Sequence, residues 1–395
     1  MTNYLFNIAK LSIVTALLAT TRLPAVAAEL TPPGGLVVQL GAEAIKLSAA
    51  LSRTGAHLVH VLETDTGRVV GARTDLNTNG CYGLVSVEHV AGFARLPYTE
   101  NLVNHMIVSR AGAPAPEIFR VMTPGGTLVL THKGIMNQAK LESAGFDSII
   151  ETGAALTARK PWPAEMDEWS HSRHAANGNA VSHDTAVGPP DRIRWVAGAT
   201  EEVEGVVTAG GRNFYGGVLA RDSFNGLRLW HRDLGKVRRN IGTFRLPRLG
   251  GTRARPVASA KNVVAVEQRR LVALDALTGE LARTFTGISQ PRELLLCGEA
   301  VIACDTKAIA AFDAESAELL WRQESAGVRN LAADGGTVAF IRRGLNDPSK
   351  DEAVALDIGS GDVKWFRADY PWLKEVIRTV LYGKYLAFEV SSLND

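Results

Sequence analysis

The sequence has little cysteine, and its three cysteines are not spaced for haem attachment. Cys81, Cys297 and Cys304 form no Cys-x-x-Cys pair and no Cys-x-x-Cys-His run, which excludes covalent c-type haem binding. Cys297 and Cys304 flank a turn at Gly298-Glu299. A two-residue turn there pairs Cys297 with Ala300, so the pattern disfavours a disulfide even in an oxidising compartment.

The chain also lacks an excess of charge of either sign. It has 43 Lys and Arg against 41 Asp and Glu, a net charge of +2. Two of the basic residues, Lys10 and Arg22, lie in a segment that we expect to be removed. Proteins that bind nucleic acid carry a clear basic excess, so we expect no nucleic-acid partner.

No apolar run reaches the roughly 20 residues that a transmembrane helix needs. The N-terminus has Lys10, an apolar run over residues 11–19, and then the small residues 25–28. This order is typical of a secretory signal, although a buried helix is the alternative. We predict a signal peptide over residues 1–28, export to the periplasm or beyond, and no transmembrane span afterwards. No cysteine follows the small residues, so we expect no lipid anchor there.

Strand and helix signals alternate over residues 34–160. Short apolar runs predict four buried strands, at residues 36–40, 57–63, 102–109 and 127–131. Helix signals fall at residues 42–51 and 116–122. Strands separated by helices predict a doubly wound, Rossmann-like α/β sheet.

The turn after the first predicted strand is poor in glycine. Only Gly41 stands there, and Ala44 and Ile45 follow where a bound nucleotide would need space. Glu63 ends the second strand 22 residues after Gly41, a spacing that suits a contact to ribose hydroxyls. A surface carboxylate is the alternative interpretation of Glu63. Gly41 and Glu63 are therefore the candidate residues of a degenerate nucleotide site.

Three segments of this part resemble class I S-adenosylmethionine-dependent methyltransferases. Residues 117–130 resemble their late helix, turn and strand, residues 96–104 the approach to their fourth strand, and residues 144–158 their closing hairpin. The resemblance implies S-adenosylmethionine as cofactor. The glycine-poor turn and the predicted export both argue against that cofactor, so we expect an inactive domain.

Residues 161–190 form the predicted junction to the second part, after a stiff Pro-Trp-Pro connector. His171, His174 and His183 fall close together, with Asp184 beside them. Imidazole and carboxylate groups are metal ligands, so these four residues are candidate ligands. A polar strand that leads into the second part is the alternative, since no complete ligand spacing is present.

One pattern, Ala-x-Asp followed by Gly and Trp, recurs four times. The copies cover residues 220–230, 273–283, 311–321 and 355–365, and their Asp residues are spaced by 53, 38 and 44. A blade of a β-propeller takes about 40–50 residues, so the period fits blades. Residues 191–395 are therefore predicted to be about four all-β propeller blades, in a ring that is incomplete.

The motif residues are predicted to be structural. The Asp accepts from backbone amides of a tight turn, the Gly takes a positive φ, and the Trp wedges against a neighbouring blade. They are Asp222, Gly226, Trp230, Asp275, Gly279, Asp313, Trp321, Asp357, Gly361 and Trp365. Ala317 replaces the Gly of the third copy and Arg283 the Trp of the second, so we expect looser packing there.

These repeats resemble those of pyrroloquinoline quinone (PQQ)-like propeller proteins, including ones joined to a methyltransferase-like domain. The resemblance implies that PQQ with calcium would lie on the propeller axis of a catalytic relative. Such repeats also serve as binding scaffolds without a cofactor, because a fold does not fix a function. The sequence assigns no cofactor beyond these alternatives.

A strongly basic segment lies between the first two copies. Residues 232–255 hold eight basic residues and one acidic residue, with Gly and Pro interleaved. Arg238, Arg239, Arg245 and Arg248 are candidates for an anion site that takes an acidic polysaccharide or an envelope protein. A solvated loop is the alternative.

The sequence thus predicts an exported envelope scaffold that binds through its propeller and carries an inactive methyltransferase-like domain. A PQQ-dependent oxidoreductase is the first alternative and a methyltransferase the second.

Overall fold

The computed structural model describes residues 34–186, 188–189, 193–197, 206–215, 218–232, 234 and 254–391. The predicted signal peptide therefore lies outside the described residues. The chain forms two compact units. Unit 1 comprises Met1–Ala164, Pro189–Val196 and Phe224–Leu229, and unit 2 comprises Glu165–Gly188, Ala197–Ser223 and Trp230–Asp395. Among the described residues, no helix is long and apolar enough to cross a lipid bilayer.

Unit 1 contains a seven-stranded mixed sheet in the order β3-β2-β1-β4-β5-β7-β6. Its strands are β1 (Gly35–Leu40), β2 (His57–Glu63), β3 (Val85–His89), β4 (Val103–Val108), β5 (Met122–Leu130), β6 (Asp147–Thr152) and β7 (Ala155–Arg159). Strands β1 to β5 pair in parallel, and β7 pairs antiparallel with both β5 and β6. The predicted Rossmann-like domain is confirmed, and so is its closing hairpin.

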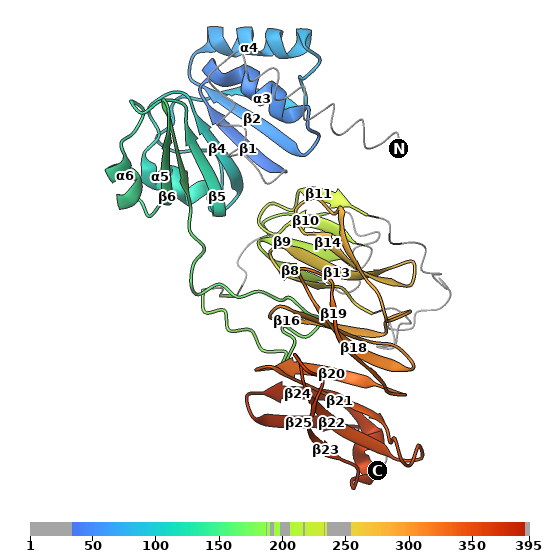
Figure 1. Cartoon of the computed structure of the whole chain (residues 1–395). Helices are drawn as coiled ribbons and strands as arrows, with labels where there is room; N and C mark the ends of the chain where they lie inside the picture. The colour runs from blue at the N-terminus through green and yellow to red at the C-terminus, as the bar shows by residue number, and fades with distance from the viewer. Residues whose placement is uncertain are drawn as a thin grey trace. The chain divides into compact units, whose positions relative to one another are not determined.

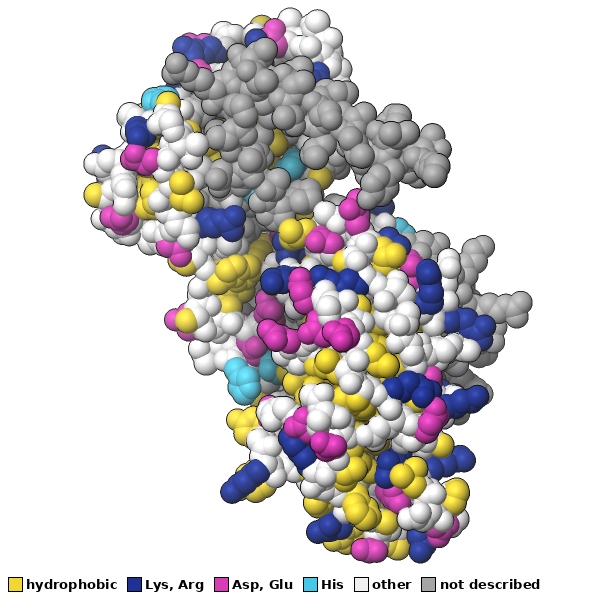
Figure 2. Space-filling model, viewed as in Figure 1, with side chains coloured by type: hydrophobic (Ala, Val, Ile, Leu, Met, Phe, Trp, Pro, Cys, Tyr) yellow, Lys and Arg dark blue, Asp and Glu magenta, His cyan; other side chains and the backbone are white. Residues whose placement is uncertain are grey.

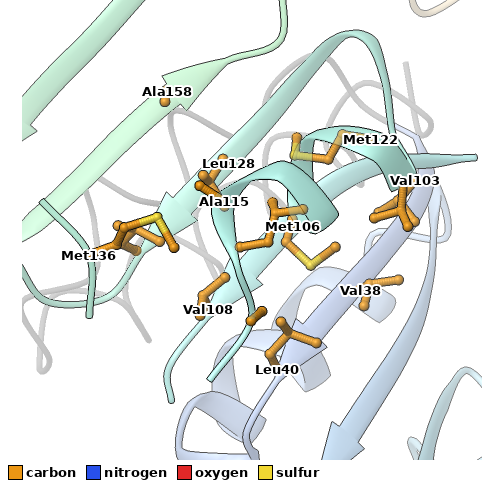
Figure 3. Packing of buried hydrophobic residues seen from close by; sticks show 14 of the residues in the cluster. Val38, Leu40, Val103, Met106, Val108, Ala115, Met122, Leu128, Met136 and Ala158 are labelled. Carbon is orange, nitrogen blue, oxygen red and sulfur yellow. The ribbon is translucent and has the colours of Figure 1, made fainter. Parts of the chain in front are cut away.

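Helical segments cover both faces of this sheet (Figure 1). They are η1 (Ala42–Ala44), α3 (Ile45–Ser52), α4 (Thr66–Thr78), α5 (Ala115–Val121) and α6 (Gln138–Ser143). Alternation along β1 sends Val37 to the core under α3 and α4, and Val38 to the core under α5 and α6. Figure 3 shows the second core, where Met106 and Leu128 of the sheet pack near Ala115 of α5.

Five antiparallel sheets follow along the chain, coloured yellow to red in Figure 1. Four have four strands in sequential order: β8 (Val207–Ala209) to β11 (Arg228–His231), β12 (Val257–Ala258) to β15 (Leu281–Phe285), β16 (Glu293–Cys297) to β19 (Leu319–Glu324), and β20 (Arg329–Asp334) to β23 (Val363–Arg367). The strands between these ends are β9 (Arg212–Tyr215), β10 (Leu219–Asp222), β13 (Asn262–Glu267), β14 (Arg270–Asp275), β17 (Ala300–Cys304), β18 (Ala308–Asp313), β21 (Thr337–Arg343) and β22 (Asp351–Asp357). The 3-10 helix η2 (Pro371–Glu375) leads into the fifth sheet, which has only β24 (Val376–Tyr382) and β25 (Tyr385–Val390).

The predicted all-β second part is confirmed at the level of its sheets. The first strands of successive sheets, β8, β12, β16, β20 and β24, lie next to one another in turn. No sheet closes on itself within the described residues. Cys297 pairs with Ala300, as the turn at Gly298 predicts, and the three cysteines are free thiols.

A polar segment, residues 167–179, runs across the first strands of all five sheets; we call it the strap. The amides of Thr208, Ala258, Ala333 and Leu381 donate to strap carbonyls, and that of Leu296 donates to the His171 ring. These partners belong to β8, β12, β20, β24 and β16. The first strand of each sheet is an edge strand, so the strap pairs amides that the sheets leave open.

Candidate functional site

The turn after β1 has the place of a nucleotide site but is filled by the chain's own side chains. Gly41 adopts φ 89, and a Cβ atom there would lie 2.8 Å from both Arg110 Cβ and Ser109 Oγ. A glycine is required at this position because of that crowding. Ala44 and Ile45 were expected to obstruct a ligand, but they pack against the core under α3 and α4. The side chains that lie beside Gly41 are those of Glu43 and Arg110.

Glu63 is enclosed by donors from its own chain. Its Oε2 atom accepts from the Ala42 amide at 2.9 Å. Its Oε1 atom accepts from the Thr64 and Asp65 amides, at 2.7 and 3.0 Å, and from Arg110 Nη1 at 2.5 Å. The Glu63 side chain is 0% exposed. The carboxylate therefore presents no surface to a ribose.

Arg110 is the residue that closes this turn, and the sequence analysis did not single it out. Its guanidinium binds Glu63 and also Glu43, with Nη2 2.6 Å from Glu43 Oε1. Arg68 forms a second ion pair with Glu43, and Ser109 Oγ donates to it at 3.1 Å. We call Glu43, Glu63, Arg68, Ser109 and Arg110 the Glu63–Arg110 cluster.

Within this cluster, the contacts between Glu43 and Arg110 favour the charged form of both side chains. Burial opposes ionisation of Glu43, but hydrogen bonds from Arg110 and Ser109 and the charge of Arg110 hold its pKa below the usual range. The same hydrogen bond raises the pKa of Arg110. The position of Arg110 in the sequence could have identified it as a site residue. It follows the fourth predicted strand, and the carboxyl ends of the strands form the edge where such sheets bind ligands.

The junction histidines divide into two environments. His174 Nε2 lies 2.6 Å from Asp167 Oδ2, and the His174 and His183 ring centroids are 5.5 Å apart. Figure 2 shows histidine side chains, in cyan, at several places on the surface. Asp184 accepts from the Asp167 amide at 3.4 Å.

His171 faces away from this group. Its Nε2 accepts from the Leu296 amide at 3.1 Å, so its Nδ1 carries the proton shared with Ser170 Oγ at 2.8 Å. Burial, together with the nearby His174, lowers the pKa of His171 to about 4. The predicted set of four ligands is not assembled. No group of three or more His, Cys, Asp or Glu within the described part of the chain has metal-binding geometry.

The motif Asp residues cap their turns. Asp275 Oδ1 accepts from the amides of Leu277 and Thr278 at 2.9 and 2.8 Å. Asp313 and Asp357 accept in the same way from residues two and three positions later. A hydrogen bond from the Lys364 side chain, together with the backbone hydrogen bonds, lowers the pKa of Asp357 to about 2. Asp222, at the end of β10, is buried.

Each motif Trp whose next copy holds a Gly packs on that Gly. Trp230 lies over Gly279, and Trp321 over Gly361, with a Cβ at Gly361 falling 2.8 Å from the Trp321 ring. The indole also donates to the backbone, from Trp321 Nε1 to Ile358 O at 2.7 Å. Gly226 faces Trp195, and these glycines have φ of 72 to 77. Trp365 packs partly buried between β22 and η2.

The two residues that depart from the motif stand at the two positions that would form one Trp–Gly contact. Arg283 stands in the Trp position of the second copy, and Ala317 in the Gly position of the third, which that Trp would cover. Arg283 instead binds Glu315 at 3.1 Å. A small side chain is tolerated at Ala317 because no indole lies over it. The expected looser packing stays a prediction.

The candidate anion-binding residues Arg238, Arg239, Arg245 and Arg248 lie outside the described residues. Arg232, at the start of the same basic segment, binds Glu267 at 2.7 Å.

No protein-family model matches the chain, and no curated protein matches it. Solved structures similar to the N-terminal part include a SAM dependent methyltransferase from Aquifex aeolicus, with 18% identity, 37% of this chain and 95% of that chain covered, and a TM-score of 0.31. A putative methyltransferase from Bacillus halodurans has 13% identity, coverage of 35% and 97%, and a TM-score of 0.29. The [4+2]-cyclase SpnF has 18% identity, coverage of 36% and 82%, and a TM-score of 0.31.

Proposed function

We propose that the chain is an exported scaffold of the cell envelope that binds a partner through its β-sheet part. In this proposal the α/β unit is a methyltransferase-like domain that has lost cofactor binding. The predicted signal peptide supports export, and the near balance of charges supports a partner other than nucleic acid.

The enclosure of Glu63 is the observation that supports the loss of cofactor binding in this proposal. A ribose can reach the carboxylate only if Arg110 leaves, and leaving would break a 2.5 Å ion pair at a side chain with no exposure. Removing one partner of a buried pair costs several kcal/mol, in the range of about 3–5. The glycine-poor turn beside it supplies no compensating space. The residues present do not fit S-adenosylmethionine.

Methyl transfer is the alternative that the fold favours. The order of the seven strands, with an antiparallel hairpin at one end, agrees with the resemblance seen in residues 96–158. S-adenosylmethionine is therefore the first cofactor to test. A function cannot be assigned from a fold alone, so the titration decides.

The experiment is a calorimetric titration of the mature protein with S-adenosylmethionine. We expect no binding heat for the folded protein, because the ribose acceptor and the turn are both occupied. The titration is repeated with Arg110→Ala, which removes the guanidinium that covers Glu63, and we expect this variant to bind S-adenosylmethionine more tightly than the unaltered protein if Arg110 closes the turn. Arg95→Ala, at an exposed arginine away from the Glu63–Arg110 cluster, is the matched control and should behave as the unaltered protein does. Micromolar binding by the unaltered protein would overturn the proposal and establish the methyltransferase alternative.

We further propose that the five antiparallel sheets are propeller blades. Their sequential strand order and the succession of neighbouring first strands support this assignment. The strap covers the edges of those first strands. No observation favours the PQQ-dependent alternative over a binding scaffold.

A further inference from the structure

The hydrogen bonds of Asp167 orient the His174 ring. The carboxylate accepts at Oδ2 from the His183 amide at 2.6 Å and from Ser182 Oγ at 3.0 Å, besides the His174 ring at 2.6 Å. A carboxylate only accepts, so His174 Nε2 is the donor of this contact, and Nδ1 is the ring nitrogen left to bind a metal ion in the neutral imidazole.

The imidazole ring of His183 lies next to the ring of His174. The His174 and His183 centroids lie 5.5 Å apart with the planes at 74°. A metal–nitrogen bond of about 2.0–2.1 Å places an ion roughly 3.2 Å from each ring centre. The separation of the two ring centres is therefore compatible with one shared ion at a bent nitrogen–metal–nitrogen angle. His174 is 5% exposed, whereas His183 is exposed and gives solvent access.

The backbone conformation of His174 and the acidic residues around it also set the His174–His183 pair apart. His174 has φ 66, a left-handed conformation that is strained for a non-glycine residue. Residues 165–188 contain four acidic residues, Glu165, Asp167, Glu168 and Asp184, against the single base Arg173. A negative segment attracts a dication.

We propose that His174 and His183 bind one divalent transition-metal ion of the Zn²⁺ or Cu²⁺ class, with water completing the coordination. Asp167 is the positioning residue, because it holds the His174 ring by the nitrogen that does not bind the metal. A carboxylate in this arrangement fixes the tautomer of a ligating histidine and raises its basicity. Imidazole ligands select borderline ions over Mg²⁺ and Ca²⁺. This pair replaces the four-ligand set predicted from the sequence, since His171 is engaged elsewhere.

The test is a calorimetric titration of the full mature chain with Zn²⁺ in a buffer that does not chelate it. We expect one ion per chain. His183→Ala should weaken binding at least tenfold, and Asp167→Asn should weaken it roughly 10–100-fold, the range for partners of a ligating histidine. His231→Ala is the matched control, because it removes an exposed histidine of the same unit. It should bind Zn²⁺ as the unaltered protein does.

A second measurement separates ligation from folding. Electron paramagnetic resonance of the Cu²⁺-loaded protein should show coupling to two nitrogens in the unaltered chain and to one in His183→Ala. Because His183 is exposed, this variant is expected to fold. Absence of Zn²⁺ binding at millimolar concentrations, or equal affinity in the unaltered chain and His183→Ala, would overturn the proposal.

Discussion

At the scale of single residues, the tautomer of His57 is determined by its neighbours. Thr54 Oγ1 donates to Leu51 O at 2.7 Å, so it accepts the proton of His57 Nδ1 at 3.0 Å. His57 Nε2 is then free to accept from the Gly34 amide at 3.3 Å. Burial lowers the pKa of His57 to about 4, and burial together with His57 lowers that of His105 to about 3.

These histidines should make unit 1 sensitive to mild acid. The unfolded chain binds a proton at His57 below pH 6.5, whereas the folded chain does so only near pH 4, so stability falls as the pH drops between them. The difference corresponds to about 3 kcal/mol for a fully buried group. In calorimetric unfolding at pH 7 and pH 5, His57→Gln should show a smaller loss than the unaltered protein. His132→Gln, at an exposed position, should leave the loss unchanged.

Residue types alone singled out Gly41 and Glu63, but not the hydrogen bonds and ion pairs that enclose Glu63. Glu63 and Gly41 stand at strand ends, where spacing along the chain is informative. Arg110 meets them only because β1 and β4 are neighbours in the sheet, a pairing that no local pattern encodes. Likewise, His171 and His174 are three residues apart but belong to different environments, since the strap is not helical.

At the scale of elements, the Trp–Gly contacts join successive sheets. Gly361 has φ 77 and lies under Trp321, whereas Ala317 has φ 61 and the preceding copy has Arg283 in place of the Trp. Gly361→Ala should therefore destabilise unit 2 by at least about 2 kcal/mol, from strain and the clash together. The reverse change, Ala317→Gly, should alter stability by no more than about 1 kcal/mol.

Denaturant unfolding of the two variants and of their Trp321→Ala counterparts measures this contact. In the Trp321→Ala background the cost of Gly361→Ala should shrink to the conformational strain of about 1 kcal/mol. An equal cost with and without Trp321 would show that the indole does not create the requirement for glycine.

Most strands and turns could be predicted from the sequence, whereas the strap could not. Apolar runs such as residues 36–40 and the recurring Asp turns reflect local chemistry, and the sheets follow them. The strap has no periodic pattern of apolar residues, because its carbonyls and the His171 ring form hydrogen bonds to amides that are distant in the sequence. Helix α4 was also missed, since its small and polar residues give almost no amphipathic pattern.

At the scale of the whole molecule, the two units have separate hydrophobic cores. Ile118, with 0% exposure, belongs to the core of unit 1, and Phe340, with 1% exposure, belongs to that of unit 2. We expect two calorimetric transitions. Ile118→Ala should lower one of them and Phe340→Ala the other, each by a cavity effect of about 2–5 kcal/mol. A single transition lowered by both variants would contradict this independence.

The strap also bears on the order in which the sheets assemble. It leaves the ribosome before any of the sheets that it joins, and its partners arrive progressively later, from Thr208, 39 residues after Trp169, to Leu296, 125 residues after His171, and then Leu381. Pairings this distant in sequence form slowly, because long loops must close first. We therefore expect the sheets to be added to the strap one at a time, from β8 towards β24. A chain that lacks β24 would leave strap carbonyls unpaired, and exposed backbone of this kind makes an incomplete chain prone to aggregation.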